Sequence, residues 1–187
     1  MKNVKMIAFV GMTGSGKSQA ARYLKEKGVP DVYLGGVIYK AMEEAGIEIT
    51  PESQQKFREE IREREGKDFV ARQVIGQVHG LLGAGQKRII IDGIYSWTEY
   101  RMFKHEFPGT ITTIALVPTK KVRHERLKRR SERPFTPQEA NQRDWSEIEN
   151  LEKGGPIADA DYYIVCDDDG EEMERAVDAI VREIGFF

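Results

Sequence analysis

The segment Gly11-Met12-Thr13-Gly14-Ser15-Gly16-Lys17-Ser18 has the residue types and the spacing needed to hold a polyphosphate. It fits the pattern G-x-x-x-x-G-K-[ST] at every fixed position. Its glycines let the backbone curl around phosphates and point successive N–H groups inward, where a Cβ would obstruct. Lys17 can neutralise phosphate oxygens, and the Ser18 hydroxyl can coordinate Mg²⁺. The segment therefore predicts nucleotide binding, with ATP as phosphoryl donor and Mg²⁺ as cofactor.

The surroundings of this segment distinguish it from a chance glycine-rich turn. An apolar run, Val4–Val10, precedes it, and Gln19–Glu26 continues as a credible helix. The first turn of that helix adds partial positive charge where phosphates would bind. The residues predicted to contact ATP here are Gly11, Thr13, Gly14, Ser15, Gly16, Lys17, Ser18 and Gln19.

A carboxylate, Asp92, follows the apolar run Ile89–Ile91 and precedes Gly93. In parallel α/β sheets ligands bind at the carboxyl ends of strands, so Asp92 is expected to face the same crevice as the phosphate-binding segment. There it could hold Mg²⁺ through water or orient an acceptor hydroxyl as a base. The alternative is that Asp92 caps the helix that follows. We predict a catalytic and metal-binding role and leave the choice between base and metal ligand open.

The segment from Thr119 to Arg133 is strongly basic, with eight Lys or Arg residues against two Glu. Four arginines are spaced by three or four residues, which places them on one face of a helix: Arg123, Arg126, Arg130 and Arg133. A basic segment of this kind could act as a lid that closes over bound ATP and stabilises the charge on the transferred group. A solvated helix face and a nucleic-acid patch are the alternatives. The lid interpretation makes Arg126 and Arg130 catalytic, with Arg126 also contacting ATP.

Short apolar runs alternate with longer, charged, helix-like stretches, which indicates βαβ construction and a parallel sheet covered on both faces. The expected strands are Val4–Val10, Val32–Leu34, Arg88–Ile91, Ile111–Val117 and Tyr162–Val165. The expected helices are Lys17–Lys27, Val37–Ala45, Ser53–Arg64, Phe69–Leu82, Thr98–Phe107, Lys120–Arg130, Pro137–Leu151 and Glu171–Ile184. Thr50 and Pro51 are expected to start the third helix, and Gly154-Gly155-Pro156 to follow the end of the seventh.

The bulk properties indicate one cytoplasmic α/β domain over residues 1–187. A formal charge of −2 argues against adhesion to nucleic acid or to a membrane surface. The single cysteine, Cys166, cannot form an internal disulfide, which suits a reducing compartment. The first apolar run is too short for a signal peptide or a membrane span. The expected partner is a small-molecule acceptor, and the sequence does not determine the oligomeric state.

With these motifs the chain resembles the nucleoside-monophosphate-kinase-like P-loop kinases, in particular adenylate kinases, dephospho-CoA kinases and a prokaryotic family related to both. The matching pieces cover nearly the whole chain: Gly11–Ser18, Gly35–Ile38, Asp92–Ile94, Arg126–Arg130, Arg143-Asp144 and Ala158–Val165. The resemblance implies a three-layer α/β/α fold with a five-stranded parallel sheet. It also implies an acceptor-binding region at about 35–85 and a helical lid at about 119–150.

The resemblance also assigns roles to particular residues. Lys17, Ser18, Asp92, Arg126 and Arg130 fall where these kinases bind phosphate or magnesium or carry lid groups. The loop Cys166-Asp167-Asp168 falls where they commonly touch adenine, which makes Asp167 a predicted ATP contact.

Two departures from the family pattern concern the acceptor. Adenylate-kinase-like enzymes grip phosphates with arginines in G-D-x-x-R and D-G-x-x-R segments, whereas this chain has Gly35-Gly36-Val37-Ile38-Tyr39 and Asp92-Gly93-Ile94-Tyr95. Because tyrosine offers one hydroxyl instead of a bidentate cation, we expect a neutral hydroxyl acceptor facing Tyr33, Tyr39 and Tyr95. These tyrosines could instead be packing residues, and the third and fourth helices could supply the missing charge through Arg58, Arg62 or Arg72.

The sequence thus predicts an ATP- and Mg²⁺-dependent kinase whose acceptor is a small nucleotide-, nucleoside- or CoA-precursor-like molecule, with Tyr39, Tyr95 and Arg72 as its acceptor-binding residues. The rival prediction is a nucleotide-dependent switch that acts on a macromolecule. The lost acceptor arginines favour the switch, whereas the basic lid segment favours the kinase.

Overall fold

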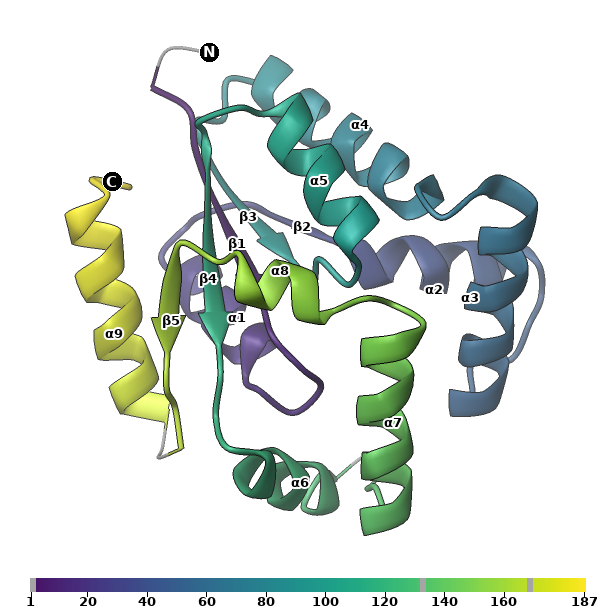
Figure 1. Cartoon of the computed structure of the whole chain (residues 1–187). Helices are drawn as coiled ribbons and strands as arrows, with labels where there is room; N and C mark the ends of the chain where they lie inside the picture. The colour runs from purple at the N-terminus through teal and green to yellow at the C-terminus, as the bar shows by residue number, and fades with distance from the viewer. Residues whose placement is uncertain (1–2, 132–133, 168–169) are drawn as a thin grey trace.

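The computed structural model describes residues 3–131, 134–167 and 170–187, and its centre is one all-parallel sheet (Figure 1). The strand order is β2-β3-β1-β4-β5. The strands are β1 Lys5–Val10, β2 Asp31–Tyr33, β3 Arg88–Asp92, β4 Ile111–Leu116 and β5 Tyr162–Ile164. Every predicted strand is confirmed to within one residue at each end, and the predicted α/β class and five-stranded parallel sheet are confirmed.

The helices pack on both faces of this sheet and beyond its carboxyl edge (Figure 1). They are α1 Lys17–Glu26, α2 Leu34–Glu44, α3 Pro51–Glu65, α4 Phe69–Gly83, α5 Trp97–Glu106, α6 Lys120–Lys128, α7 Pro137–Glu149, α8 Gly154–Ala158 and α9 Gly170–Glu183. Several predicted boundaries were wrong. Helix α2 begins at Leu34, three residues earlier than expected, and α6 and α7 each end two residues earlier than expected, at Lys128 and Glu149. The glycine–proline turn after α7 forms the short helix α8.

The central strand β1 is buried on both faces, as its unbroken apolar run predicts. Met6, Ala8 and Val10 belong to the core formed with α2, α4 and α5, while Ile7 and Phe9 belong to the core formed with α1 and α9. Because successive side chains of a strand point to opposite faces, this one segment joins both layers. The phosphate-binding loop after Val10 therefore starts from a strand that is packed on both faces.

The order of the strands brings the polar residues of the site together. Strand β1 lies between β3 and β4, and Phe9 of β1 is in register with Asp92 of β3. The loops that follow these parallel strands open at the same edge, where α6 and α7 also lie (Figure 1). This edge is the place where open α/β sheets bind ligands.

Helix α3 begins with the cap that its sequence predicts. The Thr50 side chain accepts a hydrogen bond from the Ser53 N–H at 3.1 Å, the Ser53 hydroxyl accepts one from the Thr50 N–H at 2.8 Å, and Pro51 occupies the first turn. Replacing Thr50 with alanine is expected to destabilise the protein by about 1 kcal/mol, because one N–H of the first turn loses its partner. Urea unfolding measures this loss. Thr50→Ser keeps the hydroxyl and should remain close to the wild type; an equal loss in both variants would contradict the capping argument.

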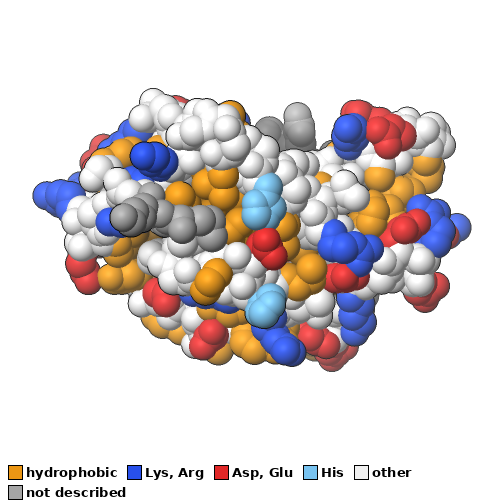
Figure 2. Space-filling view, turned by 90° about the horizontal axis from the view of Figure 1, so that it is seen from above, with side chains coloured by type: hydrophobic (Ala, Val, Ile, Leu, Met, Phe, Trp, Pro, Cys, Tyr) orange, Lys and Arg blue, Asp and Glu red, His pale blue; other side chains and the backbone are white. Residues whose placement is uncertain are grey.

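The surface over the amino ends of the strands carries intermixed charges (Figure 2). Acidic and basic side chains alternate there with apolar ones, and neither sign forms a broad field on this face. Within the described part of the chain, every helix is too short or too polar to span a bilayer.

Candidate active site

The loop between β1 and α1 has the backbone shape of a phosphate cradle. Gly11 and Gly14 have φ values of 147° and 85°, which L residues with side chains rarely adopt. A Cβ on Gly14 would lie 2.9 Å from the carbonyl oxygen of Arg123, so the loop packs directly against α6. Both glycines are therefore required by backbone geometry and by close packing.

Lys17 lies inside this loop with 8% of its surface exposed. Its Nζ donates to the carbonyl oxygen of Met12 at 3.0 Å. Burial and the nearby charge of Lys153 together lower the pKa of Lys17 to about 7, against the opposing effect of Glu147 and Asp92. The ammonium group is therefore held in a site that favours the arrival of negative charge.

This pKa predicts that nucleotide binding depends on pH. A bound phosphate stabilises the protonated form of Lys17. Above pH 7, where Lys17 of the free protein has lost its proton, binding is therefore accompanied by proton uptake. Affinity for ADP should be full below pH 7 and should fall by up to about tenfold per pH unit above it. Above pH 7 the phosphate groups, with a second pKa of about 6, are already ionised, so the fall in affinity reports Lys17. Calorimetry in two buffers of different ionisation enthalpy measures the proton uptake, and a pH-independent affinity would contradict this role of Lys17.

Ser18 and Asp92 supply oxygen ligands of the kind that Mg²⁺ prefers. Ser18 is exposed on the first turn of α1, and Asp92 ends β3 beside Lys17. Burial raises the pKa of Asp92, while the charge of Lys17 acts in the opposite direction. Among the described residues, no group donates a hydrogen bond to this carboxylate, and no cluster of three His, Cys, Asp or Glu side chains could hold a metal without help. The pair fits a Mg²⁺ ion that completes its coordination with phosphate and water.

A buried carboxylate on α7, Glu147, contacts the phosphate-binding loop directly. Its Oε2 accepts the N–H of Thr13 at 3.0 Å, and its Oε1 accepts the Thr13 hydroxyl. The side chain of Glu147 is fully buried. Helix α7 is thus anchored on one backbone amide of the phosphate-binding loop, that of Thr13.

Two cations neutralise Glu147. The Lys153 Nζ lies 2.8 Å from Oε1 and is almost completely buried, and the Arg143 Nε donates to the same oxygen at 3.0 Å. Burial opposes ionisation of Glu147, but the charges of Lys153 and Arg143 outweigh it and lower the pKa to about 2. The carboxylate is therefore ionised under all physiological conditions, and Lys153 also lies over the ring of Tyr95 at 5.0 Å.

The basic segment is divided between structural and site-facing residues. Arg123 is buried, forms a two-point ion pair with Asp144 of α7 at 2.7 and 2.9 Å, and donates to the Thr13 carbonyl at 3.2 Å. Since α6 ends at Lys128, Arg130 lies beyond the helix, where it contacts the Phe135 ring and acts on the charge of Lys17. The prediction of four arginines on one helical face therefore fails beyond Lys128. Arg133 lies outside the described residues.

Arg126 and Asp167 meet at the loop that follows β5. The Arg126 Nη2 donates to the carbonyl oxygen of Cys166 at 2.7 Å, and Asp167 accepts the N–H of Thr119 at 2.6 Å. The loops after β4 and β5 are thereby tied together beside α1. Their roles toward ATP stay predictions, and Asp168 lies outside the described residues.

The three predicted tyrosines form one cluster near Asp92. The Tyr33 and Tyr39 rings are 6.5 Å apart, and Tyr33 and Tyr95 lie close enough for each to influence the pKa of the other. Burial raises the pKa of Tyr95 well above its usual value, with a further contribution from Tyr33. The cluster thus forms an aromatic surface with hydroxyl groups at the carboxyl end of β3.

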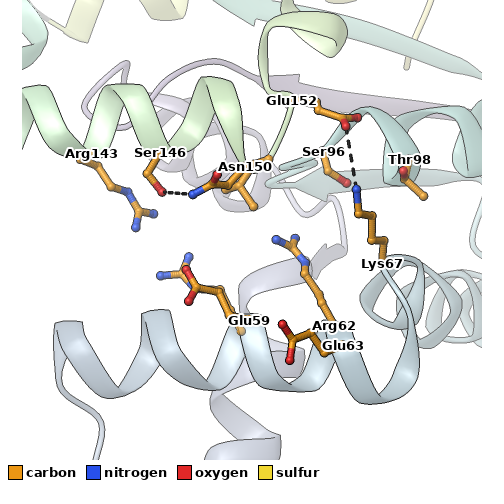
Figure 3. A pocket seen from close by; sticks show the side chains of 12 residues that line it. Glu59, Arg62, Glu63, Lys67, Ser96, Thr98, Arg143, Ser146, Asn150 and Glu152 are labelled. Atoms are coloured by element: carbon orange, nitrogen blue, oxygen red, sulfur yellow. Dashed lines mark hydrogen bonds and ion pairs between the residues drawn. The ribbon is translucent and has the colours of Figure 1, made fainter.

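Arg72, also predicted to bind the acceptor, does not join this tyrosine cluster. It is exposed on α4, where its guanidinium pairs with Asp68 and donates to the Glu65 carbonyl at 2.9 Å. A cavity of about 320 Å³ lies instead between α3, α7 and the amino end of α5 (Figure 3). Three other arginines line it: Arg58, Arg62 and Arg143.

Sequence reasoning missed the Glu147–Lys153 pair and the position of Arg143. Arg143 and Glu147 are four residues apart on one helix, a spacing that allows an ion pair, but this spacing is common on solvated helices. Lys153 precedes the glycine–proline segment that was predicted to be a turn. No local signal indicates that these charges are buried.

Solved structures that resemble this chain share its complete fold. A shikimate kinase from Bacteroides thetaiotaomicron covers 97% of this chain and 98% of its own, with a TM-score of 0.62 at 15% identity. A putative kinase from Chloroflexus aurantiacus has the same TM-score at 14% identity over 98% of both chains. The shikimate kinase of Acinetobacter baumannii, solved in complex with shikimate, has a TM-score of 0.57 at 19% identity, over 98% of this chain and 95% of its own. The protein thus has the fold of a small P-loop kinase, as predicted.

Sequence relatives define the family more closely. A family model described as an AAA domain matches residues 7–152. The UPF0200 protein of Thermococcus onnurineus is 36% identical over 182 residues, 96% of this chain and 97% of its own length. That of Sulfurisphaera tokodaii is 33% identical over 191 residues, 98% and 99% of the two chains. The chain therefore carries an AAA domain and belongs to the UPF0200 family.

Proposed function

We propose that this protein is a phosphotransferase that moves the γ-phosphoryl group of Mg²⁺-bound ATP onto a small molecule. The observation that carries the proposal is the meeting of three features at one edge of the sheet. These are the Lys17 ammonium inside the phosphate-binding loop, the Asp92 carboxylate beside it, and a cavity whose Arg143 contacts the loop through Glu147. The kinase-like fold of the structural relatives supports the same reaction class.

The proposed step is an in-line displacement. An oxygen of the acceptor attacks the γ-phosphorus, the bond from that phosphorus to the bridging oxygen breaks, and ADP leaves. If the acceptor is an alcohol, its proton passes to Asp92 or to water. Lys17 and the amides of the loop hold the phosphates and offset the charge of the transition state. Bound Mg²⁺ would supply further charge neutralisation, with Ser18 and Asp92 as the protein groups that face it.

ATP turnover with and without a pool of small metabolites tests the proposal. Stimulated ADP formation with a phosphorylated product is the expected result. Slow hydrolysis that no small molecule stimulates would favour the rival function, a nucleotide-dependent switch. The cavity, which Arg143 and Glu147 connect to the phosphate-binding loop, favours the enzyme, because a switch needs no site for a second small molecule.

Replacing Asp92 with asparagine is expected to lower turnover by about 10²-fold or more, because the carboxylate serves either the attacking hydroxyl or the bound Mg²⁺. The measurement is kcat over a range of Mg²⁺ concentrations. If raised Mg²⁺ restores part of the rate, Asp92 serves the metal; if the loss persists at saturation, it serves as the base. Asp31→Asn, at the opposite end of neighbouring β2, is the matched control. Wild-type turnover of Asp92→Asn would contradict both roles.

A further inference from the structure

The cavity between α3 and α7 holds half-buried arginines whose charge is incompletely neutralised. The side chains of Arg62 and Arg143 are 17% and 25% exposed, and each has one carboxylate partner, Glu99 at 3.3 Å and Glu147 at 3.0 Å. Arg58 donates its Nε to the Gln54 carbonyl at 3.1 Å. Among the side chains that the structure describes, which exclude those of residues 51, 52 and 55, no carboxylate lies at ion-pair distance from Arg58.

The surroundings of Arg58 disfavour its charge. Burial lowers the pKa of this guanidinium, and the neighbouring charges of Arg143 and Arg62 lower it further. The groups that act in the opposite direction are tyrosines, Tyr95 and Tyr39. A half-buried cation beside two like charges is an unfavourable arrangement for the protein alone. An oxyanion placed among the three guanidiniums would remove that cost.

Three carboxylates also line the cavity, and Figure 3 shows Glu59 pointing from α3 into the space between the helices. Glu59, Glu63 and Glu152 are all exposed to water, and Glu152 pairs with Lys67 at 4.0 Å. Figure 3 shows that pair at one end of the cavity, while Arg143 and Arg62 point from α7 and α3 into the space between the helices. The cavity therefore carries charges of both signs, and its arginines are less exposed to water than its carboxylates.

The position of the cavity suits the acceptor of a group transfer. Arg143 lines it and donates to Glu147, whose carboxylate accepts from Thr13 of the phosphate-binding loop. Arg143 and Glu147 thus connect the cavity to the loop that is predicted to bind phosphates. A volume of about 320 Å³ lies within the range of small-molecule sites.

We propose that this cavity binds the acceptor, and that the acceptor carries a phosphate or carboxylate group held by Arg58 and Arg62. The assignment of this ligand as acceptor rests on the proposed function, whereas the anion site stands on the cavity alone. Arginine suits this task because its planar fork forms two parallel hydrogen bonds with either oxyanion. The expectation of a neutral acceptor, based on Tyr39 and Tyr95, is replaced by one in which the tyrosines contact the uncharged part of the molecule.

The first experiment measures binding of inorganic phosphate by calorimetry, without any reaction. Wild-type protein saturated with Mg²⁺ and a non-hydrolysable ATP analogue should bind phosphate in a saturable way, and so should Lys17→Ala without nucleotide. Arg58→Gln should weaken that binding by about tenfold or more, through loss of one charge-assisted contact. Arg64→Gln is the matched control, because Arg64 lies on the same helix but is exposed and pairs with Glu65 at 2.9 Å.

The choice of Arg58 keeps this experiment interpretable. Removing Arg62 would leave the buried carboxylate of Glu99 without its ion pair, whereas no described side chain forms such a pair with Arg58. Arg58→Gln should therefore unfold at the wild-type temperature or above it. Phosphate binding that survives in Arg58→Gln but disappears in Lys17→Ala would place the ion in the phosphate-binding loop and overturn the proposal. Absence of saturable phosphate binding would overturn it as well.

The second experiment compares acceptors in pairs that differ only in charge. ADP formation is measured with adenosine and AMP, with glycerol and glycerol 3-phosphate, and with a hydroxy acid and its methyl ester. We expect stimulation by charged members only, and the phosphate and carboxylate pairs separate the two sources of the oxyanion. Equal stimulation by neutral members would overturn the anionic acceptor. If nothing stimulates turnover but phosphate still binds in an Arg58-dependent way, the kinase proposal fails and the anion site stands.

Discussion

Replacing Lys17 with alanine is expected to lower ATP turnover by about 10²–10³-fold and to weaken the binding of Mg²⁺–nucleotide. The physical reason is the position of the ammonium group, which is buried in the loop with its Nζ 3.0 Å from the Met12 carbonyl. In such a water-poor site a cation interacts with phosphate far more strongly than it would on the surface. Calorimetry with ADP and steady-state turnover measure the two losses.

The control for this experiment is Lys40→Ala, since Lys40 is exposed on α2 and pairs only distantly with Glu44, at 3.9 Å. Stability should be measured alongside. Burial and Lys153 already disfavour the charge of Lys17, so its removal should not destabilise the fold. Lys17→Ala that binds and turns over ATP like the wild type would refute both nucleotide binding by this loop and the proposed function.

Replacing Glu147 with glutamine is expected to destabilise the protein by about 3–5 kcal/mol, the usual cost of removing one partner from a buried ion pair. The change leaves Lys153 without its counter-charge at 2.8 Å and removes a charge-assisted contact to Thr13. Urea unfolding measures the loss. The matched control is Glu149→Gln on the same helix, because Glu149 is exposed and should change stability by less than about 0.5 kcal/mol.

A double replacement separates the ion pair from other effects. Glu147→Gln together with Lys153→Met removes both charges, so its cost should be well below the sum of the two single changes. The wild type should also lose stability as pH falls from 4.5 toward 2. The pKa of Glu147 is lowered to about 2 in the folded protein, so over this range the unfolded chain takes up a proton at Glu147 that the folded protein does not. Additive single costs, or no difference between Glu147→Gln and Glu149→Gln, would show that the pair does not stabilise the fold.

Lys17 and Glu147, the residues of these two predictions, are connected through the phosphate-binding loop. Glu147 accepts from Thr13, two residues after the start of the loop that holds Lys17, and Lys153 acts electrostatically on Lys17. Helix α7 therefore fixes the shape of the phosphate-binding loop while its other side, at Arg143, lines the cavity. A change in α7 is expected to alter both sites.

Most of the secondary structure could be predicted because it depends on local patterns. Five apolar runs gave the strands, and Thr50 with Pro51 marked the start of α3. The errors arose where tertiary contacts override those patterns. α8 forms in a glycine–proline segment packed against α5, where a Cβ on Gly155 would lie 2.6 Å from the Trp97 ring. The sequence predicted that the arginines of the basic segment share one role, but Arg123 is buried in an ion pair with Asp144.

By itself the sequence determined the parallel α/β fold, the phosphate-binding loop at Gly11–Ser18 and the carboxylate Asp92 opposite it. Each depends on residues adjacent in the chain, whose spacing fixes backbone shape or burial. Only the tertiary structure decided which charges are buried and which arginines face a cavity. Thr13 and Glu147 are 134 residues apart, and Arg58 and Arg143 come from helices whose contact no local pattern encodes. Whether a charged side chain is solvated or desolvated depends on that packing, and the proposed acceptor site depends on it too.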